Sequence, residues 1–152
     1  MFGRTRRIPL VAALALVVVT AAACGSDSSG PSPSPSTGST YSMTGVTTLA
    51  NLGGGGPGLP VTFTDGSGKT LKFENGSLVL EADGTYNLTV NVVYKDEAYD
   101  AGDLGTYNIE GNTVSLSSTL DDGSYSAVVA GSALTVTYRV KGINFDLAFQ
   151  AD

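Results

Sequence analysis

The chain has 152 residues, and about 112 of them, residues 41–152, have the composition of a globular domain, enough for one hydrophobic core. Three of the eight basic residues lie in the first seven positions, so residues 24–152 hold five basic and all fourteen acidic residues. This balance excludes a basic surface for nucleic acid, and an anionic membrane surface would repel the domain. With no histidine and one cysteine, the chain lacks the usual general base and an intramolecular disulfide.

The first 23 residues have the organisation of an export signal. Residues 1–7 are short and basic, and residues 8–19 are apolar apart from Pro9. This apolar run is too short to cross about 30 Å of hydrocarbon as a helix, which takes roughly 20 residues. It fits the apolar core of a signal peptide that is followed by small residues at a cleavage site. We therefore interpret residues 1–23 as a signal peptide that is removed.

The residues before the single cysteine indicate lipid attachment. The run Ala21-Ala22-Ala23-Cys24 resembles the lipobox of bacterial lipoproteins, with two small residues directly before the cysteine. The resemblance implies that Cys24 receives a diacylglyceryl group, that a signal peptidase cuts before it, and that its amine is acylated. This covalent lipid is the only cofactor that we expect, and it makes the membrane a partner of the chain. An ordinary secretory signal cut near Ala23 is the alternative.

The residues after the cysteine predict a location and a spacer. Gly25 stands where lipoproteins of the inner membrane usually carry an aspartate. By this resemblance we expect a lipid-anchored protein of the cell envelope, in the outer membrane if the host has two membranes. Residues 25–40 are serine, glycine, proline and threonine with one charge, so they cannot bury enough surface to offset their ordering entropy. We interpret residues 24–40 as the lipidated cysteine and a disordered tether, and residues 41–152 as a β domain.

Apolar and polar residues alternate through the domain. Leu134, Val136 and Tyr138 share one face of a segment whose other face holds Thr135 and Thr137. A period of two is typical of a β-strand with one buried face, and it recurs in residues 85–94 and 143–149. We also expect strands at residues 41–49, 59–64, 70–74 and 78–82, a flexible loop at residues 53–58, and a loop or at most one helical turn at residues 95–103.

Turn-forming residues separate these runs at even spacing. Glycine or asparagine in a two-residue turn supplies the positive φ that a tight hairpin needs. We therefore predict an all-β domain, an antiparallel meander of about eight to ten strands that closes as an up-and-down barrel, with a β-sandwich as the alternative. The turns are Asp83-Gly84, Gly111-Asn112, Asp122-Gly123, Gly131-Ser132 and Lys141-Gly142.

Three phrases of the domain resemble the repeating phrases of small bacterial lipocalin-like domains. They are GSLVLEADGTY at residues 76–86, GTYNIEGNTV at residues 105–114, and VAGSALTV at residues 129–136. The resemblance covers most of residues 41–152 and implies a calycin-type up-and-down barrel with an apolar interior. The chain has no tryptophan and so lacks the Gly-x-Trp motif of true lipocalins, and for this reason no ligand site is carried over.

Seven aromatic residues fall mostly on the inward positions of the predicted strands. They would either line a pocket for a small apolar ligand or fill the core. We favour core filling, because a barrel of about eight strands is just wide enough to be packed by its own side chains. The candidate pocket residues are Tyr86, Tyr94, Tyr107, Tyr125, Tyr138, Phe145 and Phe149.

Four acidic residues cluster between residues 95 and 103, namely Asp96, Glu97, Asp100 and Asp103. Carboxylate oxygens are the ligands that calcium prefers, so these residues are weak calcium candidates. Their spacing matches no EF-hand loop. We favour a solvated loop and expect no metal.

The sequence offers no arrangement of catalytic residues, because a serine nucleophile needs a neighbouring base and the usual one is missing. We therefore expect a non-enzymatic envelope lipoprotein that binds a small apolar ligand inside its barrel or assists another envelope protein. The alternative is a protein-interaction or adhesion module that presents loops or a sheet edge. An enzyme with an unrecognised carboxylate site is a third hypothesis.

Overall fold

The computed structural model describes residues 37–120 and 123–152 of the chain. The predicted signal peptide, Cys24, most of the predicted tether and part of the predicted turn at Asp122-Gly123 lie outside the described residues. The described residues form strands and no helix, so they hold no helix that could cross a membrane. The strands are β1 (Ser39–Thr47), β2 (Gly53–Gly54), β3 (Val61–Thr64), β4 (Thr70–Leu80), β5 (Thr85–Tyr94), β6 (Glu97–Asp100), β7 (Asp103–Glu110), β8 (Thr113–Ser118), β9 (Ser124–Ala130), β10 (Ala133–Val140) and β11 (Ile143–Ala151).

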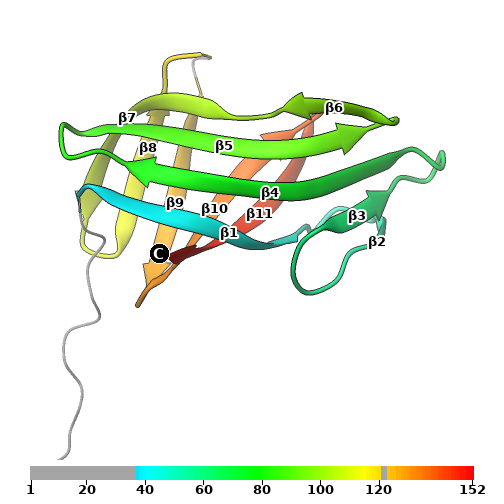
Figure 1. Ribbon diagram of the computed structural model, residues 1–152, viewed down its shortest axis with the longest axis horizontal. Helices are drawn as coiled ribbons and strands as arrows, with labels where there is room; N and C mark the ends of the chain where they lie inside the picture. The colour runs from blue at the N-terminus through cyan, green and yellow to red at the C-terminus, as the bar shows by residue number, and fades with distance from the viewer. Residues whose placement is uncertain (1–36, 121–122) are drawn as a thin grey trace, which may run out of the picture. The chain divides into compact units, whose positions relative to one another are not determined.

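Eight of these strands close a barrel. They follow one another in the order β4-β1-β11-β10-β9-β8-β7-β5, and β5 pairs with β4 to complete the ring. β2 and β3 extend the sheet beyond β4, and β6 pairs with the last part of β5. Figure 1 shows β1, β4 and β5 in front of β9, β10 and β11. The predicted all-β antiparallel barrel is confirmed, and the sandwich alternative is not what the chain forms.

Alternation and turn chemistry produce this barrel locally. In β10, Leu134 and Val136 are fully buried, while the intervening residues are exposed. β10 and β11 are joined by a two-residue turn in which Lys141 and Gly142 have φ of 48° and 83°. Two positive φ values give the turn a twist that matches the twist of the flanking strands. The hairpin register therefore places the buried faces of both strands on the same side.

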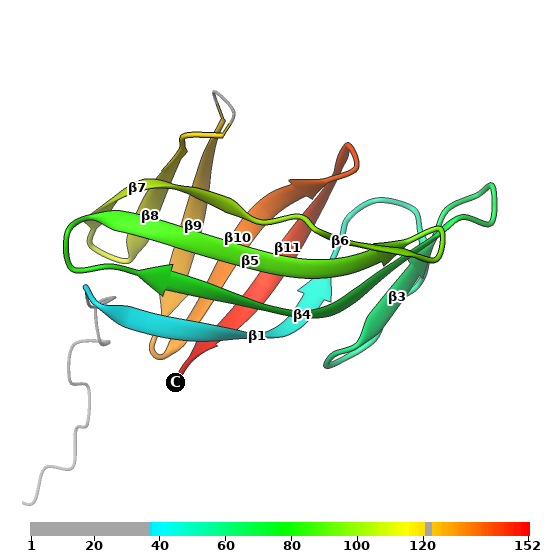
Figure 2. The ribbon, with the colours of Figure 1, turned by 45° about the horizontal axis from the view of Figure 1, so that its top comes forward.

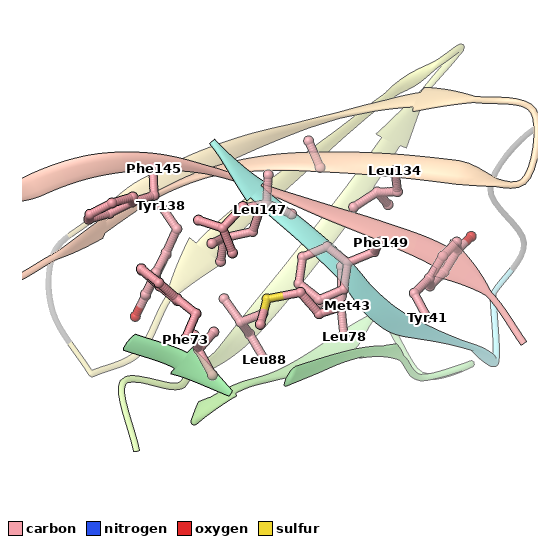
Figure 3. Close-up of a cluster of buried hydrophobic side chains, with 14 of the residues drawn as sticks. Tyr41, Met43, Phe73, Leu78, Leu88, Leu134, Tyr138, Phe145, Leu147 and Phe149 are labelled. Atoms are coloured by element: carbon pink, nitrogen blue, oxygen red, sulfur yellow. The ribbon is translucent and has the colours of Figure 1, made fainter. Parts of the chain in front are cut away.

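A single hydrophobic core lies inside the barrel. The ring of Phe145 lies 4.8 Å from that of Phe73 and 5.3 Å from that of Phe63, measured between centroids. Phe73 and Phe145 are completely buried, as is Leu147. Figure 3 shows side chains from opposite walls, among them Met43, Leu88 and Phe149, converging on this interior. Burial of these side chains supplies the main stabilising term of the fold, at about 1.5–3 kcal/mol for each large apolar residue.

The structure corrects three local predictions. Residues 95–103 are not a loop or a helical turn, because β6 pairs with the end of β5 through a turn in which Lys95 and Asp96 have φ of 53° and 65°. β4 is one strand with a register shift between Phe73 and Asn75, where two strands were expected. The predicted loop at residues 53–58 includes β2, which pairs with β3. In each case, backbone pairing with a neighbour decides the structure of a segment that lacks a clear apolar pattern.

The barrel has two ends that differ in what they hold. We call the end at which β1 begins the entry end, and the opposite end the far end. At the entry end, Gly38 N donates to Leu80 O over 2.6 Å and Asp152 N donates to Thr40 O over 3.1 Å, so β1 begins at Ser39, two residues earlier than predicted. The far end holds the turns at residues 65–68, 95–96 and 141–142. Figure 2 shows β4 and β5 running toward β3 and β6 at this end.

Candidate functional site

The seven predicted aromatic residues do not surround one common space. Phe145 and Phe149 are 0% and 1% exposed and belong to the core. Tyr107 is half-buried, and its hydroxyl donates to the Glu81 carbonyl over 2.6 Å at the entry end. Tyr94 lies at the far end, at the last position of β5. The set is therefore divided among the core and both ends of the barrel.

Tyr86 belongs to a buried polar cluster inside the barrel wall. Its hydroxyl donates to Asp103 Oδ2 over 2.6 Å, and Ser118 Oγ donates to Asp103 Oδ1 over 2.7 Å. The backbone N–H of Leu104 donates to the same Oδ1 over 2.8 Å. These bonds join β5, β7 and the end of β8. Burial, followed by the hydrogen bond to Asp103, raises the pKa of Tyr86 far above its ordinary value, so Tyr86 remains a protonated donor.

Tyr138 and Tyr125 adjoin this cluster. Their rings are 4.9 Å apart with an angle of 55° between the ring planes. The Tyr138 hydroxyl donates to the Gly102 carbonyl over 3.3 Å, one residue before Asp103. The polar cluster thus ties β10 to the start of β7, across the barrel. Since both carboxylate oxygens of Asp103 already accept hydrogen bonds, the cluster suits strand positioning rather than proton transfer.

The four acidic candidates for calcium have different surroundings. Asp96 and Glu97 are exposed at the β5–β6 turn. Asp100 Oδ1 accepts from the Gly102 N–H over 2.8 Å, and Asp103 is only 5% exposed and bonded as described above. Among residues 37–120 and 123–152 there is no group of three or more histidine, cysteine or acidic residues placed to hold a metal ion. The described structure therefore gives no coordination sphere for the calcium hypothesis.

Sequence reasoning missed the inward position of Asp103. The sequence held a signal of this position, because Asp103 and Gly105 are two residues apart and so lie on the same face of β7, where both are buried. An acidic side chain is usually assigned to solvent, and the partners Tyr86 and Ser118 lie 17 and 15 residues away. The pairing of β5 with β7 is what brings Asp103 and Tyr86 together.

Four hollows lie on the outer faces or at the ends of the described barrel. The widest, about 740 Å³, lies against the outer face of the β10–β11 hairpin and includes Thr137, Arg139 and Asn144. A smaller one of about 110 Å³ lies at the far end and includes Phe63 and Lys141. The other two lie against the β5–β7 side. None of the four is lined by Phe73, Phe145 or Phe149.

A group of lysines and tyrosines at the far end was not predicted. Lys141 Nζ lies 4.3 Å from the ring centroid of Tyr99 and 5.7 Å from that of Tyr94. Lys95 Nζ lies 5.2 Å from the Tyr94 centroid. An ammonium over an aromatic face is attracted by the negative face of the ring and keeps its charge. These residues come from β5, β6 and the β10–β11 turn, so their meeting depends on the closure of the barrel.

Comparison of the chain with models of protein families, with curated proteins and with solved structures found no match. The assignment of a function therefore rests on the geometry of the chain itself.

Proposed function

We propose that this chain is a lipid-anchored protein of the cell envelope whose barrel is a non-enzymatic binding module that acts through its far end. The observation that carries the proposal is the filled interior. Phe73 and Phe145 occupy the space between opposite walls, and both are completely buried. A carrier of the lipocalin kind needs an enclosed space of about 300 Å³ or more for its ligand. The outer surface is then where a partner would be bound.

The position of the predicted tether supports an orientation in which the far end points away from the membrane. The described acidic residues at the entry end are Glu81, Asp83, Glu110 and Asp152. The described basic residues all lie in the far half, at Lys69, Lys72, Lys95, Arg139 and Lys141, but seven acidic residues lie there as well, so charge does not decide the orientation. The predicted tether joins the domain at the entry end, where β1 begins at Ser39. A lipid on Cys24, at the start of that tether, would therefore place the membrane at the entry end.

Two of the four large exposed apolar side chains of the described residues lie in loops at far-end strand termini and support that end as the binding surface. Leu49 is 100% exposed in the segment after β1, and Leu120 is 66% exposed in the segment after β8. Both segments follow the far-end termini of their strands, Leu49 beside β10 and β11 and Leu120 beside β5 and β7. Large apolar side chains in exposed loops are what a protein partner would cover.

Photo-crosslinking in living cells of the host tests this proposal. A photoreactive amino acid is placed at Leu49 or at Leu120, and at Asn112 in the entry-end turn as the matched control. We expect discrete crosslinked adducts from positions 49 and 120 and none from position 112.

Two outcomes would refute the proposal. Adducts only from position 112, or from no position, would show that the far end is not the surface in use. Retention of a Cys24→Ser variant in the membrane fraction, with no loss of labelling by a fatty-acid analogue, would refute the lipid anchor.

A further inference from the structure

The hollow of about 110 Å³ at the far end combines apolar walls with cationic side chains. Phe63 and Leu71 are 5% and 6% exposed and form its floor together with Ile143. The side chains of Lys69 and Lys141 also line it. The walls come from β3, β4, β5 and the β10–β11 hairpin, so the closure of the barrel shapes this pocket.

Neither lysine of the pocket forms a salt bridge with a carboxylate of residues 37–120 and 123–152. The ion pair found among residues 37–120 and 123–152 joins Lys72 to Glu74 over 2.9 Å, outside the pocket. Asp65 also lines the pocket, and its Oδ1 accepts from Ser67 N, Ser67 Oγ and Lys69 N over 2.7–2.9 Å. These bonds, and then the charge of Lys69, lower the pKa of the Asp65 carboxyl, so one negative charge stands beside the two lysines. Lys141 is held by the Tyr99 and Tyr94 rings, which leave its charge unneutralised.

A buried donor lies beside these cations. The Tyr99 hydroxyl is buried and has no hydrogen-bond partner among the described residues. Buried polar groups are usually bonded, so an unpaired one calls for an acceptor. The Tyr99 ring lies beside the pocket rather than in its lining, with Lys141 Nζ 4.3 Å from its centroid.

We infer that this pocket binds a small organic anion, a carboxylate on a single ring or a short apolar chain, with the apolar body inside and the carboxylate between Lys69 and Lys141. Benzene fills an engineered apolar cavity of about 150 Å³, so about 110 Å³ accepts at most one ring. Drug-sized ligands need about 300–1,000 Å³ and are excluded. This inference deepens the proposed function, on which it rests for the exposure of the far end.

Titration of the mature chain with benzoate tests the inference. The protein is residues 24–152 with Cys24→Ser, so that it carries no lipid, and binding is followed by NMR chemical shifts. We expect benzoate to cause saturable shifts at Leu71 and Ile143. Benzyl alcohol, which keeps the ring without the charge, and acetate, which keeps the charge without the ring, should each bind at least about ten-fold more weakly. A hydrogen bond to a charged group contributes roughly this factor.

Substitutions distinguish binding in this pocket from a general effect of the positive charge of the chain. Lys141→Gln and Lys69→Gln should each weaken benzoate binding by about ten-fold, because each removes one ammonium and keeps an exposed, unbranched side chain. Lys72→Gln is the matched control, since it makes the same change outside the pocket, and it should alter binding by less than about two-fold. Thermal unfolding of each variant checks that the fold is kept.

The results have distinct meanings. The inference is overturned if benzoate gives no saturable shift, if benzyl alcohol binds as well as benzoate, or if Lys72→Gln weakens binding as much as Lys141→Gln. If benzoate does not bind but positions 49 and 120 give crosslinks, only the inferred ligand of the pocket is refuted. If benzoate binds but no crosslinks form, the proposed protein partner is refuted and the assignment of the pocket stands.

Discussion

Tyr86 in β5 stands directly opposite Gly105 in β7, and the absence of a side chain at Gly105 leaves room for the Tyr86 ring. A Cβ atom at position 105 would lie 2.9 Å from Tyr86 Cε1 and would overlap the Ser117 carbonyl oxygen. Because the ring fits against this bare backbone, its hydroxyl reaches Asp103 two residues earlier. One glycine thus sets the geometry of the buried polar cluster.

Gly105→Ala should destabilise the barrel by more than about 2 kcal/mol, because β7 and β8 must separate or the Tyr86 ring must move. Gly45→Ala is the control, since a Cβ there would meet nothing within 4 Å and the backbone needs no positive φ. The control should change stability by less than about 1 kcal/mol. Urea unfolding measures both, and equal effects would show that the contact at Gly105 is relieved easily.

Tyr86→Phe should lower the free energy of unfolding by about 1.5–3 kcal/mol, because a buried carboxylate loses one donor and the loss involves a charged acceptor. Tyr107→Phe removes a hydroxyl that donates to the neutral Glu81 carbonyl, so it should cost about 0.5–1.5 kcal/mol. Chemical denaturation of the two variants side by side gives the comparison. A larger loss for Tyr107→Phe would contradict the assigned role of the cluster.

Stability should fall at alkaline pH. The pKa of Tyr86 is raised in the folded chain, mainly by burial and then by the bond to Asp103, and burial also raises the pKa of Tyr99. Since the unfolded tyrosines ionise near pH 10 and the folded ones do not, this stability is present below about pH 10 and is lost as pH rises further. Urea midpoints measured from pH 7 to 11 should fall only above about pH 10, and Tyr86→Phe should make the fall shallower. An unchanged slope in that variant would refute the assignment to Tyr86.

Phe145→Ala should lower stability by about 3–5 kcal/mol and open a space within the barrel, because its ring contacts Phe63 and Phe73. An apolar cavity of that kind binds benzene or xenon, so the variant should gain a binding site that the parent chain lacks. Phe145→Leu serves if the alanine variant is too unstable, with a smaller effect. Val128→Ala, at a position that is 60% exposed, should have little effect. Xenon uptake by the parent chain equal to that of the variant would mean that the interior is not filled.

The barrel could be predicted from the sequence because its signals are local. Alternation at Leu134 and Val136 identified β10, and the pair Lys141-Gly142 identified the next turn. β6 could not be predicted in this way, because it has exposed residues on both faces and is held by backbone pairing with β5. A strand without a buried face leaves no alternation to detect.

The far-end pocket and the buried cluster could not be predicted because their parts are distant in the chain. Lys69 and Lys141 come from different hairpins, and they share the pocket once β4 and β11 are joined through β1. Asp103 is buried through partners on two other strands. Whether the aromatic residues fill or line the barrel depends on ring contacts such as that of Phe73 with Phe145, which no local pattern encodes.

Native mass spectrometry of the mature protein, released gently from the membrane of its own host, tests the filled interior most directly. We predict the mass of the chain from Cys24 with its covalent lipid and no bound apolar molecule. A stoichiometric apolar passenger that leaves only when the protein unfolds would contradict the account, because Phe73 and Phe145 could not then occupy the interior as they do here.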